Sequence, residues 1–240
     1  LHRLIRRQRQ MCIRDRPYGV WISEIMLQQT RVAAVLDYYR RFLEAAPAVA
    51  DLAAMPEDQL MKLWQGLGYY SRARNLQKAA RQIMETHGGV FPNTYEEIRA
   101  LSGVGDYTAG AISSIAFHLP VPAVDGNVLR VAARVCGDSS DITTPAMKRK
   151  VTQALAQIIP LEAPGDFNQA MMELGATVCG PNTAPRCDDC PVSGLCLGRQ
   201  RGTAETLPVK KAKKERRVEE KTVLLLKRDG KIALRKRPKT

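Results

Sequence analysis

Apolar residues recur every three or four positions along most of this chain, from residue 17 to about residue 161. That spacing places apolar side chains on one face of an α-helix, so the pattern predicts helices and no strand here. Glycine and proline interrupt the pattern repeatedly, and the segments between them predict six to ten short helices. The interruptions fall at Pro47, Pro56, Gly66, Gly68, Gly88, Gly89, Pro92, Gly103, Gly105, Pro120 and Pro122.

The segment around Thr94 marks the start of one of these helices. Asn93 and Thr94 are followed by Glu96 and Glu97. A threonine that caps a helix, with a glutamate three positions later, forms a capping box. We therefore expect a helix that begins after Thr94 and runs to Leu101.

The pattern changes after residue 198. Residues 199–221 are rich in Gly, Arg, Lys and Glu, which is typical of an exposed basic linker. Two short β-type runs follow at 222–227 and 231–236, and Asp229-Gly230 between them is a hairpin turn signal. Because a lone hairpin is marginal in water, we expect residues 222–240 to be the first piece of a truncated domain.

The formal net charge of +13 is concentrated at the two ends of the chain. Residues 1–16 carry six Arg against one Asp, and residues 199–240 carry 16 Lys or Arg against five acids. Residues 17–198 hold 15 basic against 18 acidic residues, so charge alone does not establish a nucleic-acid partner. Residues 1–16 also show little apolar periodicity, and we expect them to be an atypical leader outside the fold.

Four cysteines near the end of the predicted helical body give the strongest chemical signal. They are Cys179, Cys187, Cys190 and Cys196, spaced C-x7-C-x2-C-x5-C. Four thiolates on one loop suit either a zinc ion or an iron–sulfur cluster, and the spacing does not decide between them. Two disulfides are the weaker alternative. The chain shows no secretory leader or membrane-length apolar run, and Cys12 and Cys136 are left over, which suits a reducing cytoplasm.

A turn with glycines two positions apart joins two predicted helices at residues 101–110. In it, Gly103, Val104 and Gly105 precede a helix start. Such a turn lets backbone N–H groups and the next helix N-terminus approach a phosphate, as in helix-hairpin-helix DNA-binding motifs. The alternative is a plain corner between two helices, and G-x-G alone does not separate the two interpretations.

Two carboxylic acids are candidates for acid–base chemistry. Glu24 has apolar neighbours and no cation at helical spacing, and desolvation there would favour the protonated form that a general acid needs. A solvent-facing glutamate is the alternative. Asp125 precedes an apolar helix at 128–135 and would ordinarily cap it, although it could instead face a positive charge developing on a sugar. The two lie 101 positions apart, so the sequence does not bring them together.

Several segments together carry a resemblance to a known family. They are SEIMLQQT at 23–30, GLGYYSRARNL at 66–76, LSGVGDYTAG at 101–110, VDGNV at 124–128, FNQAMMELGATVC at 167–179, and the cysteine loop at 179–196. From residue 17 to about 198 the chain resembles the adenine DNA glycosylases of the MutY type, in the helix-hairpin-helix superfamily that includes endonuclease III. The resemblance implies an all-α fold of two helical subdomains with DNA between them, and a [4Fe-4S] cluster on the four cysteines.

The resemblance also implies a reaction. Adenine opposite 8-oxoguanine or guanine would be flipped out of the duplex and its N-glycosidic bond hydrolysed. Glu24 would protonate the adenine, and Asp125 would stabilise the oxocarbenium-like sugar, with Tyr107 and Asn127 beside this centre. Residues expected to contact DNA are Leu27, Gln28, Gln29, Tyr69, Gly103, Val104, Gly105 and Gln169.

Three of these residues would wedge into the base stack opposite the extruded base. Leu27, Gln29 and Tyr69 have apolar, amide or aromatic side chains that suit this task. Core packing is the alternative for Tyr69, and it is a strong alternative for Leu27.

The chain departs from the family pattern at several places. Endonuclease III-type enzymes carry a nucleophilic lysine where this chain has Tyr107, so we expect a monofunctional glycosylase that leaves an abasic site. The first two cysteines are separated by seven residues and not the usual six. Residues 1–16 do not match the usual first pocket segment, and residues 222–240 resemble only the first hairpin of a MutT-like, Nudix-like α/β domain.

Two other functions compete with this one. An endonuclease III-like glycosylase/lyase would act on oxidised pyrimidines, and a non-catalytic iron–sulfur DNA-binding module would use Glu24 and Asp125 only as surface and cap residues. Under the favoured hypothesis, the chain is a monomer that binds double-stranded DNA containing adenine mispairs. It would act in a bacterial-type cytoplasm, associated with the nucleoid and not with a membrane.

Overall fold

The structure is a computed structural model that describes residues 17–30, 32–181, 184–211, 220, 222 and 225–233. The chain divides into two compact units, Leu1–Lys210 and Lys211–Thr240. The expected leader at residues 1–16 lies outside the described residues, and its exclusion from the fold stays a prediction.

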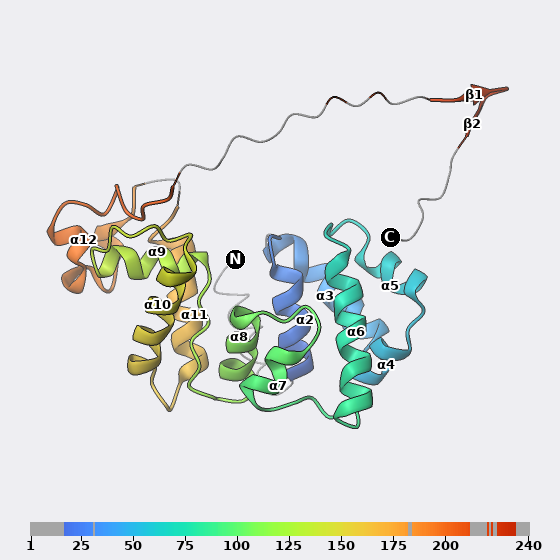
Figure 1. The fold of residues 1–240 in the computed structure, drawn as a ribbon, viewed down its shortest axis with the longest axis horizontal. Helices are drawn as coiled ribbons and strands as arrows, with labels where there is room; N and C mark the ends of the chain where they lie inside the picture. The colour runs from blue at the N-terminus through green and yellow to red at the C-terminus, as the bar shows by residue number, and fades with distance from the viewer. Residues whose placement is uncertain are drawn as a thin grey trace. The chain divides into compact units, whose positions relative to one another are not determined.

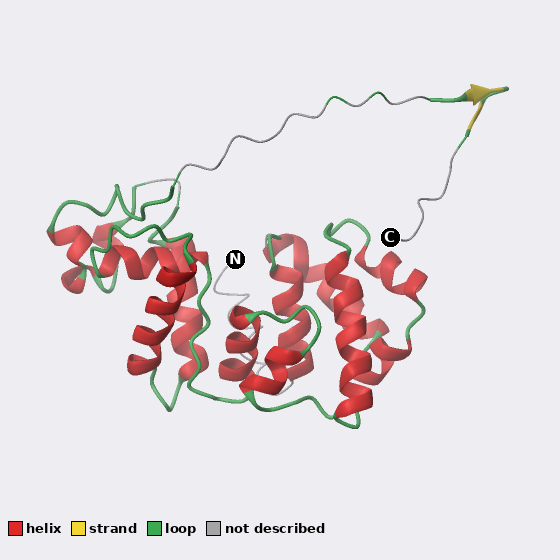
Figure 2. Ribbon diagram, in the orientation of Figure 1, coloured by secondary structure: helices red, strands yellow, loops and turns green. Residues whose placement is uncertain are grey.

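The described part of the first unit consists of helices and the loops that join them (Figures 1 and 2). Its α-helices are α2 (Pro17–Leu27), α3 (Val32–Ala45), α4 (Val49–Ala54), α5 (Glu57–Trp64), α6 (Ser71–Thr86), α7 (Tyr95–Ala100), α8 (Asp106–Ala116), α9 (Gly126–Val135), α10 (Pro145–Ile158), α11 (Pro164–Thr177) and α12 (Leu197–Gln200). Two 3-10 turns, η1 (Cys187–Asp189) and η2 (Ser193–Leu195), lie in the cysteine loop. In the described part of residues 17–161 there are nine helices and no strand, as the apolar pattern predicts.

Thr94 caps the start of α7, as predicted, and its bonds to Glu97 form part of the predicted capping box. The Thr94 hydroxyl accepts a hydrogen bond from the Glu97 backbone N–H at 3.4 Å and donates one to the Glu97 carboxylate at 2.7 Å. These bonds satisfy a backbone donor that the first turn of a helix leaves without an intrahelical partner. The helix ends at Ala100, one residue earlier than predicted.

Two hydrophobic cores organise the helices. The larger core uses the chain up to Ala123 and contains the fully buried Trp21 and Phe42. The smaller core begins at Val124 and is formed by α9 and α10, with side chains of α11 packed against it. Helix α8 contacts both α2 and α11. These cores match the two helical subdomains that the resemblance implies, and the chain crosses between them directly before the VDGNV segment.

Residues just after 199 pack within the first unit. Ala204 and Leu207 are buried, the Ile142 N–H donates to the Val209 carbonyl at 3.1 Å, and α12 contacts α9. The helical unit therefore extends past the change in composition at residue 199. None of the helices in the described ranges has the length and apolar character needed to cross a membrane.

The second unit contains an antiparallel hairpin of β1 (Lys227–Arg228) and β2 (Lys231–Ile232). Asp229 and Gly230 form its turn with φ angles of 48° and 72°. Positive φ at both positions is the geometry of a type I′ turn, which favours Asp-Gly. Each strand has two residues, and parts of the longer predicted strands lie outside the described residues. The assignment to a Nudix-like domain stays a prediction.

Candidate active site and cysteine loop

Glu24 is buried within α2. Its side chain lies in a helix whose residues from Gly19 to Met26 are all buried, and its exposed fraction is 4%. The Tyr107 hydroxyl donates a hydrogen bond to Glu24 Oε2 at 2.8 Å. The structure therefore excludes the solvent-facing alternative for Glu24 and places a polar group against it that lies 83 positions away in the sequence.

Tyr107 lies in the first turn of α8, between the two cores. Its half-buried ring packs against the larger core, and its hydroxyl also lies 3.2 Å from Met172 Sδ on α11. A tyrosine ring has few rotatable bonds, so packing on both sides fixes the position of the hydroxyl. Tyr107 can therefore orient the Glu24 carboxyl group from the helix that joins the subdomains.

Asp125 caps α9, as one of its two interpretations predicts. Its Oδ1 accepts the Val128 N–H at 2.8 Å, and its Oδ2 accepts the Asn127 side-chain amide at 2.8 Å. The residue is half-buried, at the point where the chain passes from one core to the other. Two donors hold the carboxylate in one orientation, which a residue facing a developing cation also needs.

A chain of hydrogen bonds continues from Asp125 to the cysteine loop. Arg130 Nη2 donates to Asn127 Oδ1 at 2.9 Å and to the Gly175 carbonyl at 2.6 Å. Arg130 Nε donates to the Cys179 carbonyl at 2.8 Å. Arg130 is buried, and this desolvation lowers the pKa of its guanidinium. The carboxylate and the first cysteine are thus linked through two side chains.

The glycine turn between α7 and α8 has the expected shape. Gly103 has a φ of 76°, and an added Cβ there would lie 2.7 Å from the Asn75 Cβ. Val104 is buried beneath the turn, whereas Gly103 and Gly105 are exposed. Gly105 is the N-cap of α8. The backbone at Gly103 and Gly105 is therefore exposed to solvent, while the buried Val104 side chain holds the turn against the core.

Charges beside the turn are partly neutralised. Asp106, the first residue of α8, pairs with Arg99 at 2.6 Å and with Lys148 of α10 at 3.2 Å. The hydrogen bond from Arg99 is the main cause that lowers the pKa of Asp106. Arg99 and Lys148 together carry one positive charge more than Asp106 neutralises, and a positive charge favours an approaching phosphate.

The residues predicted to wedge into DNA lie on two turns. Gln29 is exposed at the end of α2 with a φ of 55°, and Tyr69 is 61% exposed with a φ of 47°. Leu27 is half-buried and packs on the larger core, so core packing applies in part to it but not to Tyr69. Gln28 Nε2 donates to Thr108 Oγ1 at 3.3 Å, which ties the end of α2 to α8.

Gln169 forms a hydrogen bond within its own helix, α11. Its side-chain amide donates to the Gly165 carbonyl of its own helix at 3.2 Å. The neighbouring Asn168 is fully buried and connects α11 to α8, since its amide donates to Ser114 Oγ at 2.8 Å. A DNA contact for Gln169 stays a prediction.

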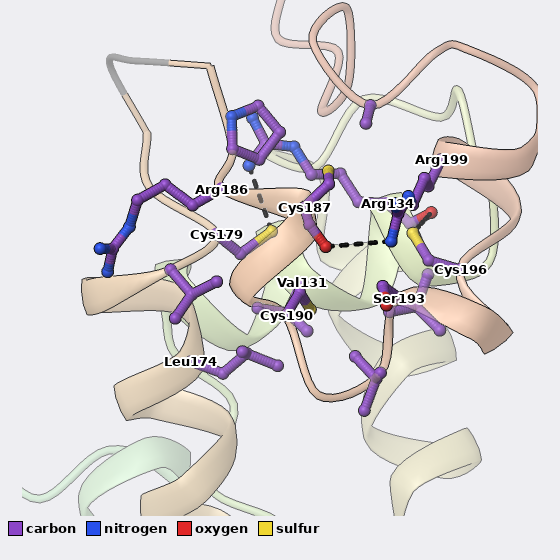
Figure 3. Close-up of a pocket in the computed structure, with 15 residues that line it drawn as sticks. Val131, Arg134, Leu174, Cys179, Arg186, Cys187, Cys190, Ser193, Cys196 and Arg199 are labelled. Atoms are coloured by element: carbon purple, nitrogen blue, oxygen red, sulfur yellow. Dashed lines mark hydrogen bonds between the residues drawn. The ribbon is translucent and has the colours of Figure 1, made fainter.

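All four predicted metal ligands line one cavity (Figure 3). They are Cys179, Cys187, Cys190 and Cys196, and the wall also includes Val131 and Leu174. Arg134 Nη1 donates to Cys179 Sγ at 3.2 Å, and Arg199 Nη1 donates to the Cys187 carbonyl at 3.1 Å. All four thiols are free, so these four cysteines do not form the disulfides of the alternative interpretation. As they stand, no three described His, Cys, Asp or Glu side chains form a group that could hold a single metal ion.

The sequence reasoning missed several residues that support the site. Thr108 contacts Gln28 after α2, Met172 contacts Tyr107 on α8, and Arg130 contacts Cys179 in the cysteine loop. Each of these partners lies 49 or more positions away in the sequence. Arg130 had one usable signal, because it lies three positions after Asn127 on the same helical face. A basic residue on a helix is usually exposed, so its burial could not be assumed.

Comparison with known proteins places these features in a family. Residues 22–159 match the family described as HhH-GPD superfamily base excision DNA repair protein. The adenine DNA glycosylase of Mus musculus is 49% identical over 197 residues, which cover 80% of this chain and 38% of that protein. The adenine DNA glycosylase of Buchnera aphidicola subsp. Baizongia pistaciae is 39% identical over 202 residues, with 84% and 57% coverage. The chain thus spans well under two thirds of these relatives.

Solved structures give the same result for the fold. A thermostable thymine-DNA glycosylase superposes with a TM-score of 0.70 at 27% identity, covering 78% of this chain and 86% of that chain. A trapped endonuclease III–DNA covalent intermediate superposes with a TM-score of 0.66 at 29% identity, covering 78% and 85%. Because the family match covers more than half of the sequence and the fold agrees, the chain belongs to the HhH-GPD superfamily of base excision DNA repair proteins.

Proposed function

We propose that this chain is the catalytic part of a monofunctional adenine DNA glycosylase that acts on adenine opposite 8-oxoguanine or guanine. The observation that carries the proposal is the buried Glu24 carboxyl group with the Tyr107 hydroxyl 2.8 Å from it. Surface glutamates need no such environment, whereas a general acid benefits from burial and a fixed orientation. The curated relatives named adenine DNA glycosylase support the choice of base.

In this mechanism Glu24 donates a proton to the adenine ring. The bond between the sugar C1′ and the base nitrogen then breaks, and its electron pair leaves with the neutral base. The positive charge that develops on the sugar faces Asp125, which its two N–H donors hold in place. Water adds to C1′ and loses a proton, which leaves an abasic site.

Tyr107 has two consequences in this proposal. It orients Glu24 through its hydroxyl, and it supplies no amine at the hairpin position where lyases carry a lysine. A Schiff base with the sugar therefore cannot form there. DNA would be bound by the backbone of the exposed glycine turn at residues 103–105, and by the wedge residues Gln29 and Tyr69.

The cysteine loop would hold a [4Fe-4S] cluster. All four cysteines line one cavity, and the family resemblance favours an iron–sulfur cluster there over one zinc ion. When bound, the cluster would supply four covalent attachments that fold the loop at residues 179–196. Arg134 would then donate a hydrogen bond to a ligand sulfur, as its contact with Cys179 Sγ suggests.

A monomer that binds double-stranded DNA in the cytoplasm, near the nucleoid, stays the accompanying prediction. Neither the assembly nor the location bears on the chemistry proposed for Glu24.

The proposal is tested by Glu24→Gln, with Glu96→Gln as control because Glu96 is exposed on α7. Adenine release from an 8-oxoguanine:adenine duplex is measured in single turnover, together with mismatch affinity. We expect Glu24→Gln to lose at least about 10²-fold in rate, within the range of general acid catalysis, while affinity and the control stay near wild type. Equal rates in all three proteins would refute the assignment of Glu24.

Monofunctional chemistry is tested separately with sodium borohydride. Reduction traps a Schiff base as a stable protein–DNA complex, and we expect no stoichiometric trapping. Abundant trapped complex, with strand cleavage before alkali, would instead support the endonuclease III-like alternative.

A further inference from the structure

A buried arginine lies between the two turns that carry the wedge residues. Arg72 is the second residue of α6 and is 9% exposed. On one side of it is the α2 end turn, residues 27–30, and on the other is the tyrosine turn, residues 66–70. We infer that Arg72 is a positioning residue that locks these turns together, so that Gln29 and Tyr69 form a single rigid wedge. This inference rests on the proposed function.

The guanidinium makes hydrogen bonds to both turns. Its carbonyl acceptors are Ile25, Met26, Gln28, Leu67 and Gly68, at 2.8, 3.1, 2.6, 3.2 and 3.3 Å. Nη1 donates to the carbonyls of α2 and its end turn. Nη2 donates to the carbonyls of the tyrosine turn and to Thr30 Oγ1, the latter at 3.4 Å. The planar fork of an arginine can bond two groups in fixed directions at once, which a lysine ammonium cannot reproduce.

Helix α2 needs these donors at its C-terminal end. The last four carbonyls of an α-helix have no intrahelical partner, and Ile25 and Met26 lie within the last four residues of α2. A cation at this end also interacts favourably with the helix dipole. Arg72 therefore stabilises the end of the helix that carries Glu24 and fixes where the chain leaves it.

Aromatic contacts hold the guanidinium in its position. Its Cζ lies 5.4 Å from the Trp64 ring centroid and 5.6 Å from the Tyr69 ring centroid. Trp64 in turn donates its indole N–H to the Gly68 carbonyl at 3.0 Å. The buried Arg72 guanidinium thus orients the exposed Tyr69 ring, because a cation–π contact requires the cation to lie over the face of the ring.

Both wedge residues adopt backbone conformations that side chains disfavour. Gln29 and Tyr69 have positive φ angles of 55° and 47°. Such conformations persist when the surroundings impose them, and Arg72 bonds carbonyls next to both residues. A wedge that is ordered in advance would not need to be immobilised when it enters the base stack. We call the hydrogen bonds from Arg72 to both turns the clamp. Loss of the clamp should therefore slow base extrusion and not the chemical step.

The test compares Arg72→Lys with Arg74→Lys in the full 240-residue chain. Arg74 lies on the same helix, and its side chain is exposed and pairs with Glu57 at 3.0 Å. Each protein is assayed in single turnover on two duplexes. In one, adenine is paired with 8-oxoguanine; in the other, adenine is an unpaired single-nucleotide bulge that needs little extrusion. We expect Arg72→Lys to be about tenfold or more slower on the paired substrate and within about threefold of wild type on the bulge. Arg74→Lys should match wild type on both.

An equal loss on both substrates, or no loss on either, would overturn the inference. Tyr69→Ala provides a second measurement that does not depend on the stability of Arg72→Lys, because Tyr69 is largely exposed. It should reproduce the paired-substrate defect, and adding Arg72→Lys to it should slow the reaction little further. Fully additive effects would count against a shared wedge.

Failure of the proposed function would look different. Wild-type protein would then release adenine from neither duplex. The clamp would still be measured by fluorescence of 2-aminopurine placed at the extruded position, which reports unstacking without bond cleavage. Wild type and Arg74→Lys should raise this signal more than Arg72→Lys, and equal signals would overturn the clamp.

Discussion

Glu24 and Asp125 are held by different means. Glu24 depends on tertiary packing, because apolar neighbours bury it and a hydroxyl from α8 contacts it. Asp125 depends on local structure, because its partners lie two and three positions further along the chain. Substitutions should therefore affect the two residues differently, and this difference can separate their structural roles from their catalytic ones.

Replacement of Asp125 by Asn and by Ala separates capping from catalysis. Asn caps helices about as well as Asp, so Asp125→Asn should keep its thermal stability, while Asp125→Ala should lose about 1 kcal/mol. Both should lose adenine release if the charge stabilises the sugar cation. Stability is measured by thermal denaturation and release in single turnover. Full activity in Asp125→Asn would leave the residue as a cap only.

Tyr107→Phe tests whether the hydroxyl orients Glu24. It removes one hydrogen bond to a carboxyl group and keeps the ring, so we expect release to slow by about 10- to 100-fold with little change in DNA affinity. Tyr18→Phe is the matched control, since it removes a 2.9 Å bond from the same helix α2 to the Ala46 carbonyl. If both variants slow release equally, the effect is general and not specific to Glu24.

For individual residues, the sequence predicted local neighbours better than contacts between distant parts of the chain. The apolar neighbours of Glu24 follow from helical spacing, and the Asp125 cap follows from its place before an apolar helix. The Tyr107 contact could not be derived from periodicity, because it joins residues 83 positions apart. Arg72 was missed for the same reason: its acceptors on α2 lie more than 40 positions away.

Among the elements, the glycine turn before α8 offers a paired test of its geometry. Gly103→Ala places a Cβ 2.7 Å from Asn75 at a positive φ, whereas a Cβ at Gly105 meets no atom within 4 Å. We expect Gly103→Ala to be less stable by about 1–3 kcal/mol, as measured by denaturant unfolding. Gly105→Ala should lose less, because only the preference for glycine over alanine at the N-cap of α8 is lost there. If both variants unfold alike, the turn is not constrained at Gly103.

If the turn binds phosphate through its backbone, DNA affinity gives a further readout. A methyl group at the exposed Gly105 should weaken binding on matched and mismatched duplexes alike, because phosphate contacts carry no base information. A change confined to the mismatch would point to base recognition.

The loop between α9 and α10 gives a pH-dependent contribution to stability. Lys150 donates to Asp138 at 2.6 Å, and this bond is the main cause that lowers the Asp138 pKa to about 2. A carboxyl group with a depressed pKa stabilises the fold above its unfolded value near 4, and the contribution is lost as pH falls toward 2. Lys150 is largely exposed, so solvent screening keeps this contribution small.

Thermal denaturation of Asp138→Asn between pH 2 and pH 7 measures this contribution. The variant should melt below wild type at pH 7, and the two should converge near pH 2. Asp37→Asn is the control, because Asp37 forms an exposed pair with Arg40 and should give little difference at any pH. A constant offset across the range would assign the effect to something other than the charge.

Element boundaries followed from local chemistry. Thr94 caps α7 and Gly105 caps α8, and both lie where the sequence places them. Within the described residues, the strands near the C-terminus lie on either side of the Asp-Gly turn signal, as predicted. The packing of Leu207 was not predicted, because a Lys- and Arg-rich composition conceals a single buried side chain.

For the whole molecule, the main consequence is that the candidate site lies where the two cores meet. Helix α8 contacts α2 on one side and α11 on the other, and it carries Tyr107. Asp125 follows the crossing between the cores, and its hydrogen-bonded chain leads through Arg130 to the cysteine loop. These contacts join residues far apart in the sequence, so periodicity and local signals could not predict them. That Glu24 and Asp125 act together stays a prediction of the family resemblance.

Base release by the purified protein from four duplexes, measured in single turnover, separates an adenine glycosylase from an enzyme that acts on oxidised pyrimidines. Adenine is placed opposite 8-oxoguanine, guanine or thymine, and the fourth duplex carries an oxidised thymine opposite adenine. We predict free adenine from the first two duplexes only, with strand breaks that appear after alkali. Release of the oxidised thymine without release of adenine, accompanied by strand breaks before alkali, would contradict this prediction.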